Sequence, residues 1–176
     1  MEILIAIMAC LVAVSFLLKV GFFPMKGLVA VAFISAAFTA WVVPRMTELP
    51  HDAFIEMCTN RNTLLNLAVC VVLEAVVMIA FCFATPRTRW MRLLLCCYPG
   101  MLFAAAICYF LAQLLFLMPG VGFELLRWIS ALAALLFVVG GSTLLRRALG
   151  NRPARQEMLF IINLLILILC VAITGY

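Results

Sequence analysis

Long apolar runs alternate with short polar segments along almost the entire chain. Each run approaches the roughly 20 apolar residues that a helix needs to cross a bilayer. The pattern therefore predicts an all-α integral membrane protein: a bundle of about six transmembrane helices in one polytopic domain over residues 1–176, with no soluble domain. The predicted spans cover residues 3–23, 27–43, 64–83, 93–118, 123–145 and 158–174.

Proline and glycine mark several of the predicted span ends. Pro44 should end the second span, and Pro99-Gly100 should kink the fourth. The longest polar segment, residues 44–63, should form an external loop with a short surface helix over residues 53–58. Lys19 lies near the end of the first span, where a long side chain can reach the headgroups.

Composition supports lipid as the solvent for these runs. Hydrophobic residues make up 69% of the chain and charged residues 11%, whereas a soluble domain has about 45–50% and about 25%. The N-terminus has no basic residue before its apolar run, unlike a cleavable signal. We therefore expect the first run to be a retained span.

Basic residues predict the orientation. Nine of the twelve Lys and Arg residues follow the first, third and fifth spans, and such residues favour the cytoplasm. We expect both termini outside and a bacterial inner membrane location. The arginines either set topology alone or also bind anionic lipid headgroups or an acidic partner, and they are Arg87, Arg89, Arg92, Arg146, Arg147, Arg152 and Arg155.

Glu74 is the acidic residue that lies deep inside an apolar run. A charge at that depth costs about 2.5–3.5 kcal/mol on insertion scales, so an ionisable residue there is a candidate functional group. Asn66 and Cys70 precede it at four-residue intervals, which predicts one polar helix face. Gln113 and Asn163 could complete a polar cluster with that face.

Three roles for Glu74 follow from the sequence. It could be a hydrogen-bonded packing residue, a proton- or ion-coupling group, or a contact with another subunit. The coupling role is weakened because the sequence shows no second deep ionisable residue that would relay a proton.

Small residues recur every four positions in two predicted spans. Such ridges allow helices to approach closely in lipid, and we expect them to dock partner helices. The ridges are Ala32, Ala36 and Ala40 in the second span and Gly100, Ala104, Cys108 and Ala112 in the fourth.

Other chemistry has little support in the sequence. Seven of the eight cysteines fall in apolar runs, where free Cys acts as a small hydrophobe. His51 has acidic neighbours, but metal sites usually show two or more His or Cys ligands at fixed spacing. We predict no metal, no cofactor, no nucleic-acid partner and no catalytic residues.

The sequence is compatible with two main hypotheses for the function. The first is a non-catalytic membrane subunit that packs against partner transmembrane helices, or against itself as a homo-oligomer. The second is a small proton- or ion-coupled transporter or channel that uses the mid-membrane Glu74. A membrane enzyme acting on lipid ranks third, because paired acid, base or nucleophile groups are missing.

Overall fold

The computed structural model describes residues 2–47, 61–83, 100–117 and 122–174, and its regular elements in these ranges are all α-helices. Helices α1, α2, α4, α7 and α8 are long and apolar enough to cross a membrane by length and composition. The all-helical class predicted from the sequence is confirmed. The helices are α1 (Glu2–Val20), α2 (Met25–Thr47), α4 (Arg61–Phe83), α6 (Met101–Leu117), α7 (Phe123–Ala148) and α8 (Arg152–Thr174).

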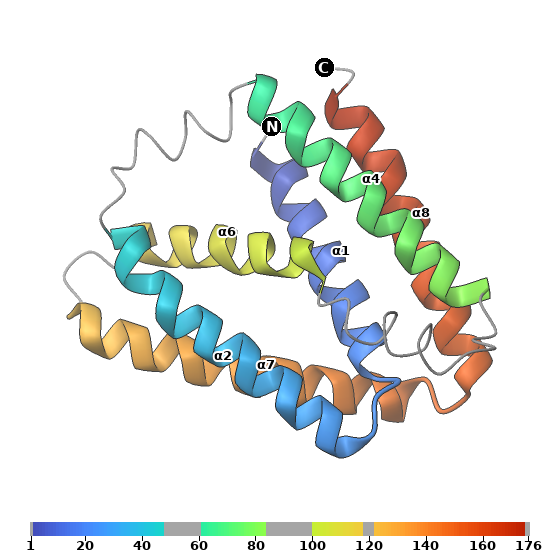
Figure 1. Ribbon diagram of the computed structural model, residues 1–176, viewed down its shortest axis with the longest axis horizontal. Helices are drawn as coiled ribbons and strands as arrows, with labels where there is room; N and C mark the ends of the chain where they lie inside the picture. Colours follow the sequence, from blue (N-terminus) through green and yellow to red (C-terminus); the bar gives the residue numbers. More distant parts are fainter. Residues whose placement is uncertain (1, 48–60, 84–99, 118–121, 175–176) are drawn as a thin grey trace.

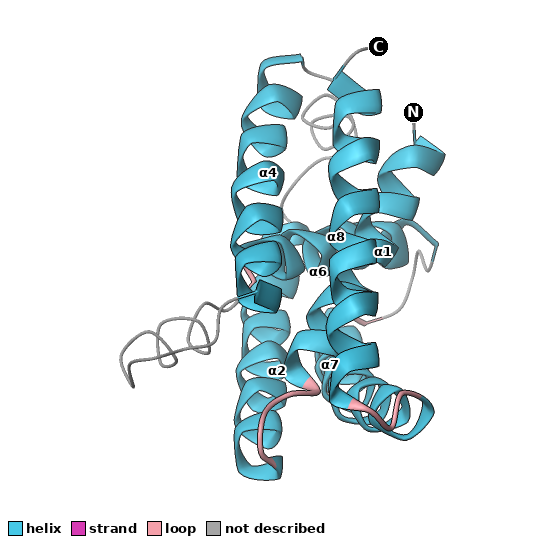
Figure 2. Cartoon of the chain, turned by 90° about the vertical axis from the view of Figure 1, so that its right-hand side faces the viewer, coloured by secondary structure: helices cyan, strands magenta, loops and turns pink. Residues whose placement is uncertain are grey.

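The helices form two antiparallel pairs joined by α1. Helix α2 lies along α7, and α4 lies along α8 (Figure 1). Helix α1 contacts α8, α6 and α7, and the shorter α6 crosses between the pairs. The beginning of α1 and the end of α8 lie at the same end of the molecule in both views (Figures 1 and 2).

Helix α1 is the most enclosed helix and organises the core. In the apolar stretch of α1, 56% of the residues are buried inside the molecule, whereas the corresponding share is 22% in α4 and in α7. Phe16 of α1 stacks on Phe103 of α6, with ring centroids 3.8 Å apart and planes 6° from parallel. This contact fixes α6 against the middle of α1.

Helix α7 crosses α1 through a backbone approach at Gly141. A Cβ at Gly141 would lie 2.7 Å from Leu17 Cδ1, closer than packed atoms tolerate. The neighbouring Ser142 is fully buried, and its hydroxyl donates a 3.3 Å hydrogen bond to the Leu17 carbonyl. Glycine and serine are small enough for this crossing, which is typical of helices that pack in lipid.

The outer faces of α4 and α7 are strongly apolar and exposed. Leu73 is 60% exposed on α4, and Trp128 is 64% exposed on α7. A soluble protein rarely leaves contiguous apolar faces of this length in water. These faces are therefore suited to contact with an apolar environment rather than with water.

Pro44 does not end the second helix, because α2 continues through it to Thr47. The last turn has other support. The Arg45 guanidinium lies 3.6 Å from the centroid of the Trp41 ring and donates a 3.1 Å hydrogen bond to the Trp41 carbonyl. A proline this close to a helix end disturbs few backbone hydrogen bonds.

Two other helices begin at positions that differ from the prediction. Helix α6 begins at Met101, after Gly100, and is 17 residues long. Helix α8 begins at Arg152, six residues before the predicted span. Asn151 precedes its first turn, where Asn is a favoured cap residue, and Pro153 fits a first turn because its missing N–H is not needed there.

Several predictions fall outside the described residues. They are the external loop with His51, the surface helix over residues 53–58, residues 93–99 of the fourth span, and Arg87, Arg89 and Arg92.

Candidate functional site

Glu74 lies within helix α4 and is buried, with 5% of its surface exposed. Its Oε2 atom accepts a 2.8 Å hydrogen bond from the backbone N–H of Leu102, the second residue of α6. Backbone N–H groups in the first turn of a helix have no partner within the helix, and they carry partial positive charge. The carboxylate of α4 therefore acts as an anchor for the beginning of α6.

Gly100 allows Glu74 and α6 to approach this closely. Its φ of +57° lies in the left-handed region that glycine adopts readily, and its carbonyl accepts a hydrogen bond from the Phe103 N–H. A Cβ on Gly100 would lie 3.0 Å from Phe16 Cδ2 and 3.3 Å from Glu74 Oε1. The residue predicted to bend a helix thus lies immediately before one, and the N-terminus of α6 faces an acid.

Lys19 gives Glu74 a basic neighbour. Lys19 lies in the last turn of α1 and is only 2% exposed, so it does not extend into the surrounding solvent as a residue near a span end was expected to do. Lys19 is therefore a buried basic residue near the end of α1, and its charge lies within electrostatic range of the Glu74 carboxyl.

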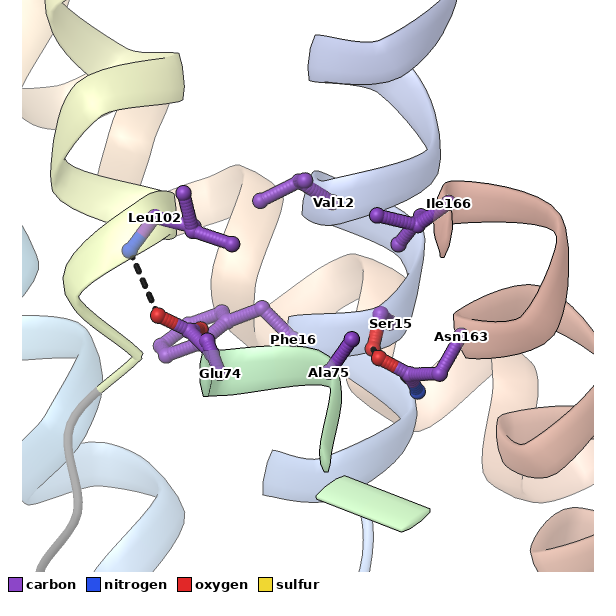
Figure 3. A pocket seen from close by; sticks show the side chains of 8 residues that line it. All are labelled: Val12, Ser15, Phe16, Glu74, Ala75, Leu102, Asn163 and Ile166. Atoms are coloured by element: carbon purple, nitrogen blue, oxygen red, sulfur yellow. Dashed lines mark hydrogen bonds between the residues drawn. The ribbon is translucent and has the colours of Figure 1, made fainter. Parts of the chain in front are cut away.

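Ser15 and Asn163 form the second polar contact of this region. The Asn163 amide donates to Ser15 Oγ at 3.0 Å and to the carbonyl of Leu159 at 2.7 Å. Figure 3 shows the two side chains pointing toward each other from α1 and α8. Asn163 is 2% exposed, so this pair ties the two helices together inside the apolar core.

A small cavity lies between the Glu74 and Asn163 contacts. Its water-accessible volume is ≈ 10 Å³, close to the minimum that one water molecule requires. Glu74, Ser15 and Asn163 supply its polar atoms, and the other walls are apolar (Figure 3). The lining residues are Val12, Ser15, Phe16, Glu74, Ala75, Leu102, Asn163 and Ile166.

The predicted polar face of α4 divides into two parts. Glu74 is buried, whereas Asn66 and Cys70 are exposed. Eight residues rotate a helix about 80° beyond two complete turns, so the ends of a four-residue series do not share one direction. Gln113 of α6 is also exposed, and of the predicted cluster partners Asn163 alone lines the cavity with Glu74.

Three of the seven residues in the small-residue ridges are buried within the chain. Ala32 is 1% exposed and Ala112 is 3% exposed, and α2 contacts both α6 and α7. Gly100 is also buried. The other ridge residues are half-buried: Ala36, Ala40, Ala104 and Cys108. In the described residues the ridges therefore contribute to packing within the chain.

Two arginines of the predicted basic loop hold the turn between α1 and α2. The Arg146 guanidinium donates to the carbonyls of Gly21, at 2.6 Å, and Phe23. Arg155 donates to the same Gly21 carbonyl at 3.1 Å and lies over the Phe22 ring. Cations at a helix C-terminus satisfy its unpaired carbonyls and its negative dipole end.

The other two described arginines of the set are exposed. They are Arg147 in the last turn of α7 and Arg152 at the beginning of α8. The four described arginines belong to helices, not to a loop, because α7 and α8 extend beyond the predicted spans.

Sequence reasoning missed Ser15 and Lys19 as site residues. A signal was present, because residues four apart share one side of a helix and Ser15 is followed at that interval by Lys19. The Leu102 partner is a backbone N–H, so no side chain in the sequence indicates it. It can be recognised only from the structure, where α6 begins beside α4.

No protein-family model, curated protein or solved structure matches the chain. The described residues define an all-helical protein in which five helices are long and apolar enough to cross a membrane.

Proposed function

We propose that the chain is a polytopic protein of a bacterial inner membrane, with both termini on the non-cytoplasmic side. Five apolar helices and their exposed outer faces support membrane insertion. The described basic residues Lys19, Arg146, Arg147, Arg152 and Arg155 cluster at the end where α1 and α7 finish and α8 begins. The positive-inside rule assigns that end to the cytoplasm.

Within this protein, Glu74 acts as the proton-binding group of a small proton- or ion-coupled transporter or channel. The observation that carries this proposal is the burial of the Glu74 carboxyl against the N-terminus of α6, beside a small cavity with polar atoms in its lining. An ionisable residue buried in a membrane helix is by default a candidate for a proton or ion pathway. Helix N-termini that point at an anionic group within the membrane also recur in transporters.

The chemistry follows from the contacts of the carboxylate. When Glu74 is charged, it is stabilised by the Leu102 N–H and by the positive end of α6. When Glu74 binds a proton, both interactions weaken together. Proton uptake would then loosen the anchor between α4 and α6, and proton release would restore it.

The test is proton flux through the purified protein in lipid vesicles, followed with a pH-sensitive dye. We expect Glu74→Gln to abolish most of the flux, because glutamine keeps the shape but cannot titrate. Glu124→Gln is the matched control, since Glu124 is an exposed residue at the start of α7. Equal flux in wild type and Glu74→Gln would contradict the proposal.

A second candidate is a non-catalytic subunit that binds a partner helix through α4. The outward face of α4 carries the exposed polar residues Asn66 and Cys70 among apolar ones such as Val69, which is 60% exposed. An amide on a lipid-facing surface gains a hydrogen bond when another helix covers it. This face is a candidate docking surface in addition to the half-buried residues of the small-residue ridges, Ala36, Ala40, Ala104 and Cys108.

The subunit function predicts stable partners. Gentle purification should then recover stoichiometric membrane proteins, or a homo-oligomer, and Val69→Trp should release them. A monomer that carries flux without partners would exclude this candidate and favour the first.

A further inference from the structure

Four arginines meet where α7 ends and α8 begins. Arg146 and Arg147 lie in the last turn of α7, and Arg152 and Arg155 lie in the first turn of α8. Between residues 143 and 160 the single acidic residue is Glu157, which is exposed. This end of the helix pair therefore carries a strong local excess of positive charge.

Two of these arginines occupy an unfavourable position for a helix. The first turn of a helix presents unpaired N–H groups and a positive dipole end, which favour anions and disfavour cations. The Arg155 and Arg146 guanidinium groups also lie close together, because both donate to the Gly21 carbonyl. A bound anion would stabilise such a site, because it would offset both the clustered positive side chains and the positive end of the helix dipole.

Arg155 has an unused hydrogen-bond donor inside this cluster. The side chain is 9% exposed, and its Nε atom has no hydrogen-bond partner among the described residues, although another nitrogen of the same guanidinium donates to Gly21. Buried N–H groups without an acceptor are rare in folded proteins. The unused donor is an independent indication that an acceptor binds here.

We propose that the α7–α8 connection binds the phosphate of an anionic phospholipid headgroup. Guanidinium groups bind phosphate oxygens through paired N–H donors, and helix N-termini bind phosphate through backbone N–H groups. The exposed Arg152 and the first turn of α8 form the outer part of the site, and Arg155 forms its inner wall. The apolar stretch of α7 ends here and that of α8 begins here. In a membrane this position corresponds to the level of the lipid headgroups.

This inference rests on the proposed membrane insertion but not on the role of Glu74. The test uses the purified full-length chain, stripped of lipid in a neutral detergent and returned to phosphatidylcholine bicelles with or without phosphatidylglycerol. The measurement is the thermal unfolding temperature. Arg152→Gln removes an exposed charge of the site, and Arg45→Gln is the matched control at the opposite end of α2.

We expect phosphatidylglycerol to raise the unfolding temperature of wild type and Arg45→Gln. Arg152→Gln should lose most of this rise and bind phosphatidylglycerol roughly fivefold more weakly, the effect of one basic residue near an anionic surface. An equal rise in Arg152→Gln overturns the proposal. An equal rise with inorganic phosphate alone overturns the headgroup as the source of the phosphate. A chain that does not enter bicelles contradicts membrane insertion itself.

Discussion

The Glu74 carboxylate accepts a hydrogen bond from the Leu102 N–H at 2.8 Å, across 28 residues of chain. An acid of one apolar helix thereby satisfies the first turn of another. A hydrogen bond to a charged group contributes about 1.5–3 kcal/mol, and an orphaned buried donor costs about as much. The contact accounts for an acidic residue in a helix that is otherwise apolar.

Removing the acceptor should destabilise the protein. We expect Glu74→Leu to lower the free energy of unfolding by about 1–3 kcal/mol, because the Leu102 N–H loses its partner. Denaturant unfolding in detergent micelles measures this loss. Glu124→Leu, an exposed residue in the first turn of α7, should cost less than about 1 kcal/mol. Equal losses in the two variants would show that the Glu74 contact contributes nothing specific.

Gly100 should tolerate no side chain. Gly100→Ala places a Cβ on left-handed backbone, at a cost of about 1–2 kcal/mol, and crowds Phe16 and Glu74. Gly140→Ala is the control, because its Cβ meets open space within helix α7. That change should stabilise the protein by about 0.5–1 kcal/mol. Opposite signs in the same unfolding assay are the expected result, and a stabilised Gly100→Ala contradicts the left-handed backbone and close packing at Gly100.

The Ser15–Asn163 contact should couple α1 to α8. A double-mutant cycle with Ser15→Ala and Asn163→Ala measures the interaction energy directly. Hydrogen bonds between membrane helices average about 0.6 kcal/mol and reach about 1.7 kcal/mol. We expect a value in that range, whereas strictly additive losses would mean that the two side chains do not interact.

Arg146 should stabilise the α1–α2 turn through its forked geometry. Arg146→Lys keeps the charge but cannot donate to Gly21 and Phe23 with the same planar fork. We expect a loss of about 1–2 kcal/mol in unfolding free energy. The exposed neighbour Arg147 provides the control, and Arg147→Lys should change stability by less than about 0.5 kcal/mol.

The sequence predicts the helices better than it predicts their partners. Apolar run length determines where a helix can form, so the long helices appear near their expected positions. Helix ends depend on local chemistry that run length ignores, such as Pro153 within the first turn of α8 and Arg45 against Trp41 at the end of α2.

Site assembly depends on tertiary contacts that the sequence does not encode in any single pattern. Asn163 was predicted to join Glu74, and both line one cavity. Asn66, Cys70 and Gln113 were grouped with them by residue type and spacing, yet they are exposed. The decisive partner of Glu74 is a backbone N–H, and its position depends on where α6 begins.

Proton flux through vesicles containing wild type, Glu74→Gln or Glu124→Gln tests the central claim most directly. If Glu74 is the proton-binding group, Glu74→Gln loses most of the flux, whereas the exposed control Glu124→Gln keeps it. Wild-type flux retained in Glu74→Gln would contradict the account.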